Sequence, residues 1–219
     1  MTTLAKTVYV VDDDPGVLKS LQWLIRSVGL SVETFDSGQA FLESYDSDGP
    51  GCVLLDVRMP GMTGMEVQNS LRTNGRDLPV IFLTGHGDVS TASRAFLSGA
   101  FDFLEKPFDG DLLLERVREA IAKDEAARRE RSQRERARER LGRLTARELE
   151  VLQYVVDGKS SREIAAALDR SVNTVENQRA CIMRKMETPN VVSLIRLVLS
   201  AGPEKEVGRL FAERSGNRR

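Results

Sequence analysis

Apolar runs and polar breaks alternate along the first 122 residues, and this alternation predicts five strands, each followed by a helix. Between the runs, apolar residues recur three or four positions apart, which is typical of helices. Strict alternation of this kind predicts a parallel sheet covered by helices on both faces, an α/β doubly wound sheet. We expect the strand order 2-1-3-4-5, which is one of the two common orders of such sheets. The expected strands are Thr7–Val11, Ser31–Phe35, Cys52–Asp56, Pro79–Leu83 and Ala100–Leu104.

Residues 143–201 show helical spacing only, and two of their short helices are joined by the tight turn Asp169-Arg170-Ser171. Helices joined in this way are typical of a helix-turn-helix. Thr145 and Glu148 have the spacing of a capping box at the start of the first helix. We expect an all-α domain of four helices, Ala146–Val156, Ser161–Leu168, Asn173–Met186 and Val191–Ser200. We expect its helix-turn-helix core to contain Ile164, Ala165, Leu168, Val172, Val175, Ile182 and Met186.

The segment between these two patterns is highly charged, and alanine is its only apolar residue between Ile121 and Leu141. Glu and Arg recur four residues apart, as in Glu130 and Arg134, which favours a solvated helix. A flexible charged tether is the alternative, and the absence of a Leu, Ile or Val heptad argues against a coiled coil. We therefore predict a first domain at 1–122, a charged, helical linker at 123–142, a second domain at 143–201 and a polar tail at 202–219.

The net charge of −1 conceals two halves of opposite sign. Residues 1–123 contain 18 acidic and 11 basic side chains, a net charge of −7, whereas residues 124–219 contain 15 acidic and 21 basic, a net charge of +6. This asymmetry indicates cation or phosphoryl chemistry in the first half and nucleic-acid binding in the second. The single histidine excludes a metal site built from several histidines.

Only two cysteines are present, one in each half, so the sequence predicts no disulfide framework and favours a reducing compartment. The N-terminus lacks the apolar core of a signal peptide, and the apolar runs are far shorter than the roughly 18 residues of a membrane span. We therefore expect a cytoplasmic protein without a membrane partner.

Charged and hydroxyl side chains follow the predicted strands at one edge of the sheet. Asp12 and Asp13 follow the first strand, Asp56 ends the third, Thr84 follows the fourth and Lys106 follows the fifth. Crowded carboxylates need a cation, and oxygen ligands favour Mg²⁺ or Mn²⁺. Taken alone, Asp12-Asp13-Asp14 is equally well explained as a helix-capping turn.

Residues 1–122 resemble the receiver domain of bacterial two-component response regulators, which has a flavodoxin-like fold. The resemblance rests on four motifs: Val10-Val11-Asp12-Asp13-Asp14, Leu54-Leu55-Asp56-Val57-Arg58-Met59-Pro60-Gly61, Thr84-Gly85-His86 and Glu105-Lys106-Pro107-Phe108. It implies that Asp56 accepts a phosphoryl group from a sensor histidine kinase. It also implies that Asp13, Asp56 and the backbone carbonyl of Arg58 hold Mg²⁺, with Asp12 supporting the ion through water.

The same resemblance gives roles to residues around the expected phosphoacceptor. Lys106 would pair with the phosphate, Thr84 would move to bond it, and Phe103 would be the switch aromatic that swings inward. An ordinary core position is the alternative for Phe103. The peptide bond Lys106–Pro107 is expected to be cis, and Arg58 and His86 occupy positions that tune dephosphorylation in the family.

Residues 143–201 resemble the LuxR-type DNA-binding domain, through Leu-Thr-x-Arg-Glu from Leu144, Gly-x-Ser-x-x-Glu-Ile-Ala from Gly158 and Thr-Val-Glu from Thr174. The whole chain is thus similar to response regulators of the NarL/FixJ type. Gln178 stands where the family often has histidine. The resemblance implies a homodimer when phosphorylated, binding to double-stranded promoter DNA, and RNA polymerase as a further partner. The expected DNA-binding residues are Asn173, Thr174, Glu176, Asn177, Gln178, Arg179, Ala180, Arg184 and Lys185.

Two other functions compete with a phosphorylation-switched transcription factor. An aspartyl-phosphate hydrolase would also use an Asp nucleophile, but Arg58 stands where such an enzyme would need a second acid, and no substrate cap is visible. A DNA-binding protein with a vestigial receiver would lack the complete set of pocket residues found here. We therefore expect a transcriptional regulator whose only catalysis is self-phosphotransfer and autodephosphorylation at Asp56.

Overall fold

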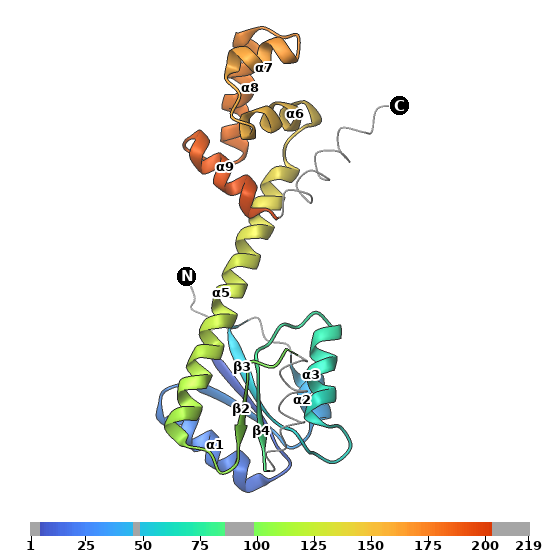
Figure 1. Ribbon diagram of the computed structural model, residues 1–219, viewed down its shortest axis with the longest axis vertical. Helices are drawn as coiled ribbons and strands as arrows, with labels where there is room; N and C mark the ends of the chain where they lie inside the picture. Colours follow the sequence, from blue (N-terminus) through green and yellow to red (C-terminus); the bar gives the residue numbers. More distant parts are fainter. Residues whose placement is uncertain (1–4, 46–48, 86–98, 203–219) are drawn as a thin grey trace. The chain divides into compact units, whose positions relative to one another are not determined.

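The computed structural model describes residues 5–45, 49–85 and 99–202, and its chain forms two compact units, Met1–Arg128 and Arg129–Arg219 (Figure 1). The predicted helix between the fourth and fifth strands falls largely within 86–98, and that segment, with His86 and most of the predicted tail, lies outside the described residues. Within the described residues, no helix has both the length and the apolar content needed to cross a membrane.

The first unit contains the predicted parallel sheet, with strands in the order β2-β1-β3-β4-β5. Every neighbouring pair is parallel, so the carboxyl ends of all the strands lie at one edge. The predicted fold class is therefore confirmed for this unit. The strands are β1 (Thr7–Val11), β2 (Ser31–Phe35), β3 (Gly51–Asp56), β4 (Val80–Thr84) and β5 (Asp102–Glu105).

Helices cover both faces of the sheet, and on each face they share an apolar cluster with the strands. One cluster joins the sheet to α1 (Pro15–Ser27) and to the beginning of α5 (Gly110–Gly142). The other joins it to α2 (Gly38–Ser44) and α3 (Gly64–Thr73). β3 is buried along its whole length, and Cys52 within it is completely buried. The nearly continuous apolar sequence of β3 follows from burial on both faces.

Helix α5 contributes to the packing of both units. In the first unit, the buried Asp124 accepts hydrogen bonds from the backbone N–H of Gly51, at 2.9 Å, and from Nε of Arg128, at 2.7 Å. In the second unit, Ala137 and Leu141 are part of the apolar core. The charged segment 123–142 is thus helical and has buried positions at each end of its sequence.

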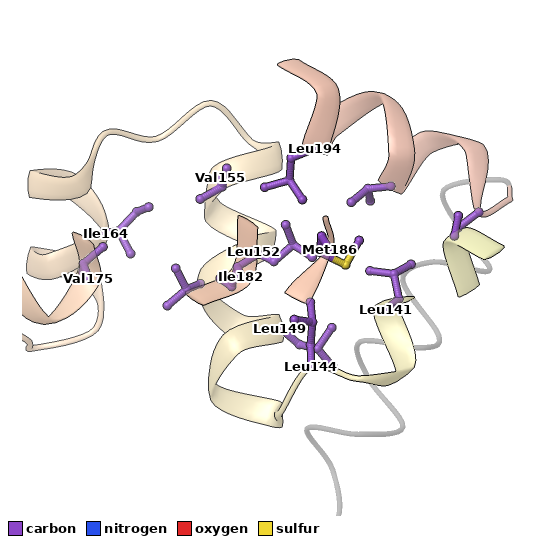
Figure 2. Packing of buried hydrophobic residues seen from close by; sticks show 14 of the residues in the cluster. Leu141, Leu144, Leu149, Leu152, Val155, Ile164, Val175, Ile182, Met186 and Leu194 are labelled. Atoms are coloured by element: carbon purple, nitrogen blue, oxygen red, sulfur yellow. The ribbon is translucent and has the colours of Figure 1, made fainter. Parts of the chain in front are cut away.

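The second unit contains α6 (Ala146–Val156), α7 (Ser161–Ala167), α8 (Val172–Lys185) and α9 (Val191–Ser200). Figure 2 shows how side chains from these helices and from α5 meet in one core. The expectation that Val172 is a core residue was wrong, because its side chain is 39% exposed. Val172 opens α8 directly after the N-cap Ser171, one turn before the first buried position, Val175.

Candidate functional site

Four parallel strands bring the expected pocket residues to one edge of the sheet. Asp12 directly follows β1, Asp56 ends β3, Thr84 ends β4 and Lys106 directly follows β5. The register pairs Asp56 with Leu83 and Thr84 with Glu105, so these strand ends are level with one another. The open edge of a doubly wound sheet near its switch point is where such folds place their ligand sites.

Lys106 joins the two buried carboxylates of this edge. Its Nζ lies 2.5 Å from Oδ2 of Asp12 and 2.7 Å from Oδ1 of Asp56. The other oxygen of each carboxylate accepts a backbone hydrogen bond, from the N–H of Asp14 at 2.9 Å and from the N–H of Arg58 at 2.7 Å. Both carboxylates are therefore fixed in position by a cation and by the loop that follows their own strand.

Burial dominates the electrostatics of the pocket. It raises the pKa of Asp12 above its usual value, and the hydrogen bonds from Lys106 and the Asp14 N–H only partly offset this effect. Burial alone would lower the pKa of Lys106, but its hydrogen bonds to Asp12 and Asp56 outweigh burial and raise that pKa. Lys106 therefore stays positively charged at neutral pH and stabilises negative charge beside it.

The donor set suits a divalent cation in chemistry and in charge. Asp12, Asp13 and Asp56 supply carboxylate oxygens, which Mg²⁺ prefers, and their formal charges with that of Lys106 sum to −2. The structure brings Asp12 and Asp56 together, whereas Asp13 is exposed. Across the described part of the chain, no three His, Cys, Asp or Glu side chains converge as a metal site would require.

The remaining expected pocket residues lie on the last two strands. Thr84 is 3% exposed at the end of β4. Phe103 is half-buried on β5, opposite Phe82, and packs against the apolar cluster beneath α2 and α3. The peptide bond Lys106–Pro107 is cis, as the resemblance to receiver domains implied.

Sequence reasoning gave no role to Gly64, the first residue of α3. A Cβ atom at this position would lie 2.3 Å from the backbone oxygen of Asp56. Gly64 also donates its N–H to the carbonyl of Val57. Only glycine lets α3 start this close to the end of β3, and the Gly directly after Thr63, the N-cap of α3, is the sequence signal that could have indicated it.

All nine residues expected to contact DNA lie in α8, and they divide into two groups by burial. Gln178, Arg179 and Lys185 are partly buried and bonded within the unit. Gln178 accepts from Arg170 at 3.3 Å, Arg179 donates to the Lys159 carbonyl at 3.4 Å, and Lys185 Nζ lies 2.7 Å from Glu148. The others are exposed: Asn173, Thr174, Glu176, Asn177, Ala180 and Arg184.

Two family models match the chain, and they fall in different units. The response regulator receiver domain matches residues 8–118, and the luxR family of bacterial regulatory proteins matches residues 142–198. The first match contains the pocket of Asp12, Asp56, Thr84 and Lys106. The second contains α6, α7, α8 and nearly all of α9.

Curated relatives and solved structures share both parts. The response regulator protein TodT of Pseudomonas putida is 40% identical over 197 residues, which is 90% of this chain and 87% of TodT. The transcriptional regulatory protein FixJ of Bradyrhizobium diazoefficiens is 38% identical over 195 residues, 89% of this chain and 95% of FixJ. The structure of response regulator StyR superposes with a TM-score of 0.82 at 38% identity, covering 89% of this chain and 98% of StyR. This chain therefore belongs to the two-component response regulators that join a receiver domain to a LuxR-type, DNA-binding helix-turn-helix domain.

Proposed function

We propose that Asp56 accepts a phosphoryl group from a sensor histidine kinase and that this event controls DNA binding by the second unit. The observation that carries the proposal is the position of Asp56 at the end of β3, with Oδ1 only 2.7 Å from Nζ of Lys106. A carboxylate held beside a permanent cation can act as a nucleophile toward phosphorus and remain oriented afterwards.

In the proposed transfer, a carboxylate oxygen of Asp56 forms a bond to the phosphorus of a phosphohistidine. The bond between phosphorus and the histidine nitrogen breaks, and that nitrogen keeps the electron pair and takes up a proton. Lys106 stabilises the charge of the transferred phosphoryl oxygens. Bound Mg²⁺, or Mn²⁺ in its place, would neutralise part of this charge, held by Asp13, Asp56 and the backbone carbonyl of Arg58, with Asp12 in support.

The phosphorylated state would be transmitted by Thr84 and Phe103. The hydroxyl of Thr84 would bond a phosphoryl oxygen, and Phe103 would change its packing against the cluster in which it now lies. A local charge change of this kind biases an element with two arrangements. The proposed outcome is a homodimer, whose two helix-turn-helix domains would meet two half-sites of promoter DNA in the cytoplasm, with RNA polymerase as a further partner.

The proposed recognition element is α8. Its exposed Asn173, Thr174, Glu176, Asn177 and Ala180 would face base edges, and Arg184 would neutralise phosphate. Gln178, Arg179 and Lys185 flank that face. The positive net charge of the second half supports a nucleic-acid partner.

The phosphoacceptor is tested by intact mass after incubation with Mg²⁺ and the small phosphodonor phosphoramidate. Wild type should gain one phosphoryl group, and Asp56→Asn should gain none, because an amide is a poor nucleophile. Asp36→Asn is the matched control: Asp36 follows β2 at the same sheet edge, but its carboxylate accepts from the hydroxyl of Ser37, whereas Lys106 pairs with Asp12 and Asp56. Equal labelling of Asp56→Asn and wild type would refute the assignment.

A further inference from the structure

Three capping boxes of the same design occur in the described chain, at the starts of α3, α6 and α7. In each, a Thr or Ser N-cap exchanges hydrogen bonds with a Glu three residues later. Glu66 and Glu163 are exposed, and their carboxylates accept hydrogen bonds from their own N-caps, Thr63 and Ser160. Glu148 differs, because it is 8% exposed and also contacts another helix.

The extra contacts of Glu148 are both on α8. Its Oε2 lies 2.7 Å from Nζ of Lys185, and its Oε1 accepts a hydrogen bond from Sγ of Cys181 at 3.2 Å. Cys181 and Lys185 are four residues apart, so they lie one above the other on the same side of the helix. One carboxylate of α6 therefore holds α8 at two points, one turn apart.

These two points lie on one flank of α8, where contacts can restrict rotation of the helix about its own axis. At about 100° per residue, Cys181 and Lys185 fall between the buried side, with Val175 and Ile182, and the exposed side, with Asn177 and Ala180. A contact on the buried side would resist only separation of the helices. A contact on the flank also resists turning of α8 about its own axis, and such turning would move every exposed side chain relative to the rest of the unit.

A second polar contact acts on the same flank. Arg170 donates to Gln178 at 3.3 Å and forms an ion pair with Glu150 of α6 at 2.8 Å. Two acidic residues of α6, Glu148 and Glu150, thus reach the flank of α8. Only Glu148 does so directly and from a buried position.

We propose that Glu148 is a positioning residue for DNA recognition, which fixes the rotation of α8 through Lys185 and Cys181. In this assignment the cation of Lys185 is used inside the domain and neutralises no DNA phosphate. The inference rests on the proposed role of α8 as the recognition helix. It adds that base discrimination depends on a carboxylate that touches no DNA.

The test uses the full chain and two DNA duplexes of equal length. One is enriched by repeated in vitro selection with wild-type protein, and the other is its scrambled sequence. Fluorescence anisotropy gives the ratio of the two affinities. Repeating it over a series of salt concentrations gives the number of phosphates neutralised, because the logarithm of the affinity falls by about 0.9 per phosphate against the logarithm of the salt concentration. Far-UV circular dichroism confirms that each variant is folded.

Glu148→Gln keeps a capping-box residue at the start of α6 but removes the charge that holds Lys185. We expect it to reduce the affinity ratio about tenfold, the scale of one lost base contact, and to leave binding to the scrambled duplex within twofold. Glu163→Gln is the matched control, with the same chemical change in a capping box whose Glu bonds its own N-cap, Ser160, and not a residue of α8. It should leave the ratio within twofold of wild type.

Lys185→Met removes the cation of the same ion pair. It also provides the test if Glu148→Gln does not fold. It should lower the ratio as Glu148→Gln does, with an unchanged salt slope, and the double variant should lose no more than either single variant. A salt slope reduced by about 0.9, with both duplexes weakened equally, would instead mean that Lys185 binds phosphate. That result, or a Glu148→Gln ratio equal to wild type, would overturn the proposal.

Asn177→Ala separates this inference from the function on which it rests. If Asn177→Ala lowers the affinity ratio and Glu148→Gln does not, α8 is the recognition helix and Glu148 has no positioning role. If Asn177→Ala and the other exposed-face variant, Glu176→Ala, both leave the ratio unchanged, α8 does not read DNA, and both proposals fall.

Discussion

Single residues set the geometry of the pocket through close backbone approach as well as through charge. A Cβ atom at Gly64 would lie 2.3 Å from the backbone oxygen of Asp56 and 3.2 Å from its carbonyl carbon. A methyl group there must displace either the end of β3 or the start of α3. Because Asp56 ends β3, either movement alters the position of the proposed nucleophile.

Gly64→Ala should therefore slow phosphorylation by phosphoramidate and lower the free energy of unfolding by about 1–3 kcal/mol, the usual effect of overpacking. Gly110→Ala is the control, since Gly110 also opens a helix but its Cβ would meet Leu24 at an ordinary 3.5 Å. Intact-mass time courses and urea unfolding measure the two effects. Equal behaviour of the two variants would show that the close approach at Gly64 is unimportant.

Glu148 makes the stability of the second unit depend on pH. Burial alone would raise its pKa, but the hydrogen bonds from Lys185, Thr145 and Cys181 outweigh burial and lower the pKa to about 2. The folded-state pKa is thus below that of the unfolded chain, about 4.3. Its contribution to stability is present above that unfolded value and is lost as the pH falls toward 2.

Thermal melts between pH 5 and pH 2 should show wild type losing stability faster than Glu148→Gln, with the two curves converging at the acid end. Glu163→Gln should remain closer to wild type, since Glu163 is exposed and its lowered pKa comes mainly from Ser160. Parallel curves for wild type and Glu148→Gln over this range would contradict the lowered pKa of Glu148.

At the scale of elements, the part of α5 that belongs to the first unit includes a buried polar contact of Asp124. Asp124 is 4% exposed and accepts from the Gly51 N–H, where β3 begins, and from Arg128. Its neighbour Glu125 makes only a surface ion pair with Lys6, at 2.9 Å. The same helical turn therefore holds one buried carboxylate and one that is only partly buried.

Asp124→Ala should cost about 1–3 kcal/mol of unfolding free energy, because it removes the buried acceptor of the Gly51 N–H and one partner of Arg128. Glu125→Ala should cost about 0–1 kcal/mol, the range for ion pairs that solvent reaches, because Lys6 and Glu125 both keep access to solvent. Hydrogen exchange at the Gly51 amide localises the effect, and it should accelerate in Asp124→Ala only. Unchanged exchange in that variant would show that the contact does not stabilise the start of β3.

The elements themselves were largely predictable, because buried parallel strands and amphipathic helices have periodic sequences. The expected Thr7–Val11 and Ala146–Val156 are reproduced to the residue, while β5 is displaced toward its carboxyl end, Asp102–Glu105, although Phe101 still donates to the Val80 carbonyl. Motif residues also predicted the meeting of Asp12, Asp56 and Lys106.

Contacts between distant polar residues could not be predicted in this way. Gly51 and Asp124 are 73 positions apart, and Glu148 and Lys185 are 37 apart. Neither pair produces a periodic pattern in the sequence, because a single hydrogen bond involves only one residue of each element. The same limit explains why Lys185 was expected to face phosphate, although its nearest carboxylate belongs to the same domain.

For the whole molecule, the proposed switch predicts a change of association state. With Mg²⁺ and beryllofluoride, a phosphoryl analogue, wild type should sediment as a dimer, whereas Asp56→Asn should remain a monomer. Asp36→Asn should follow wild type. Analytical ultracentrifugation distinguishes these outcomes. If Asp56→Asn dimerised to the same extent as wild type, dimerisation would not depend on the pocket.

The two thiols of the chain are divided between the two units. Cys52 is completely buried in β3, and burial, with the charge of Asp124, raises its pKa to about 12, whereas Cys181 is half-buried on α8. Because alkylating reagents attack the thiolate, Cys52 becomes reactive only while the first unit is open. The rate at which an alkylating reagent modifies Cys52 therefore reports spontaneous opening of the receiver in the intact regulator, without an engineered label.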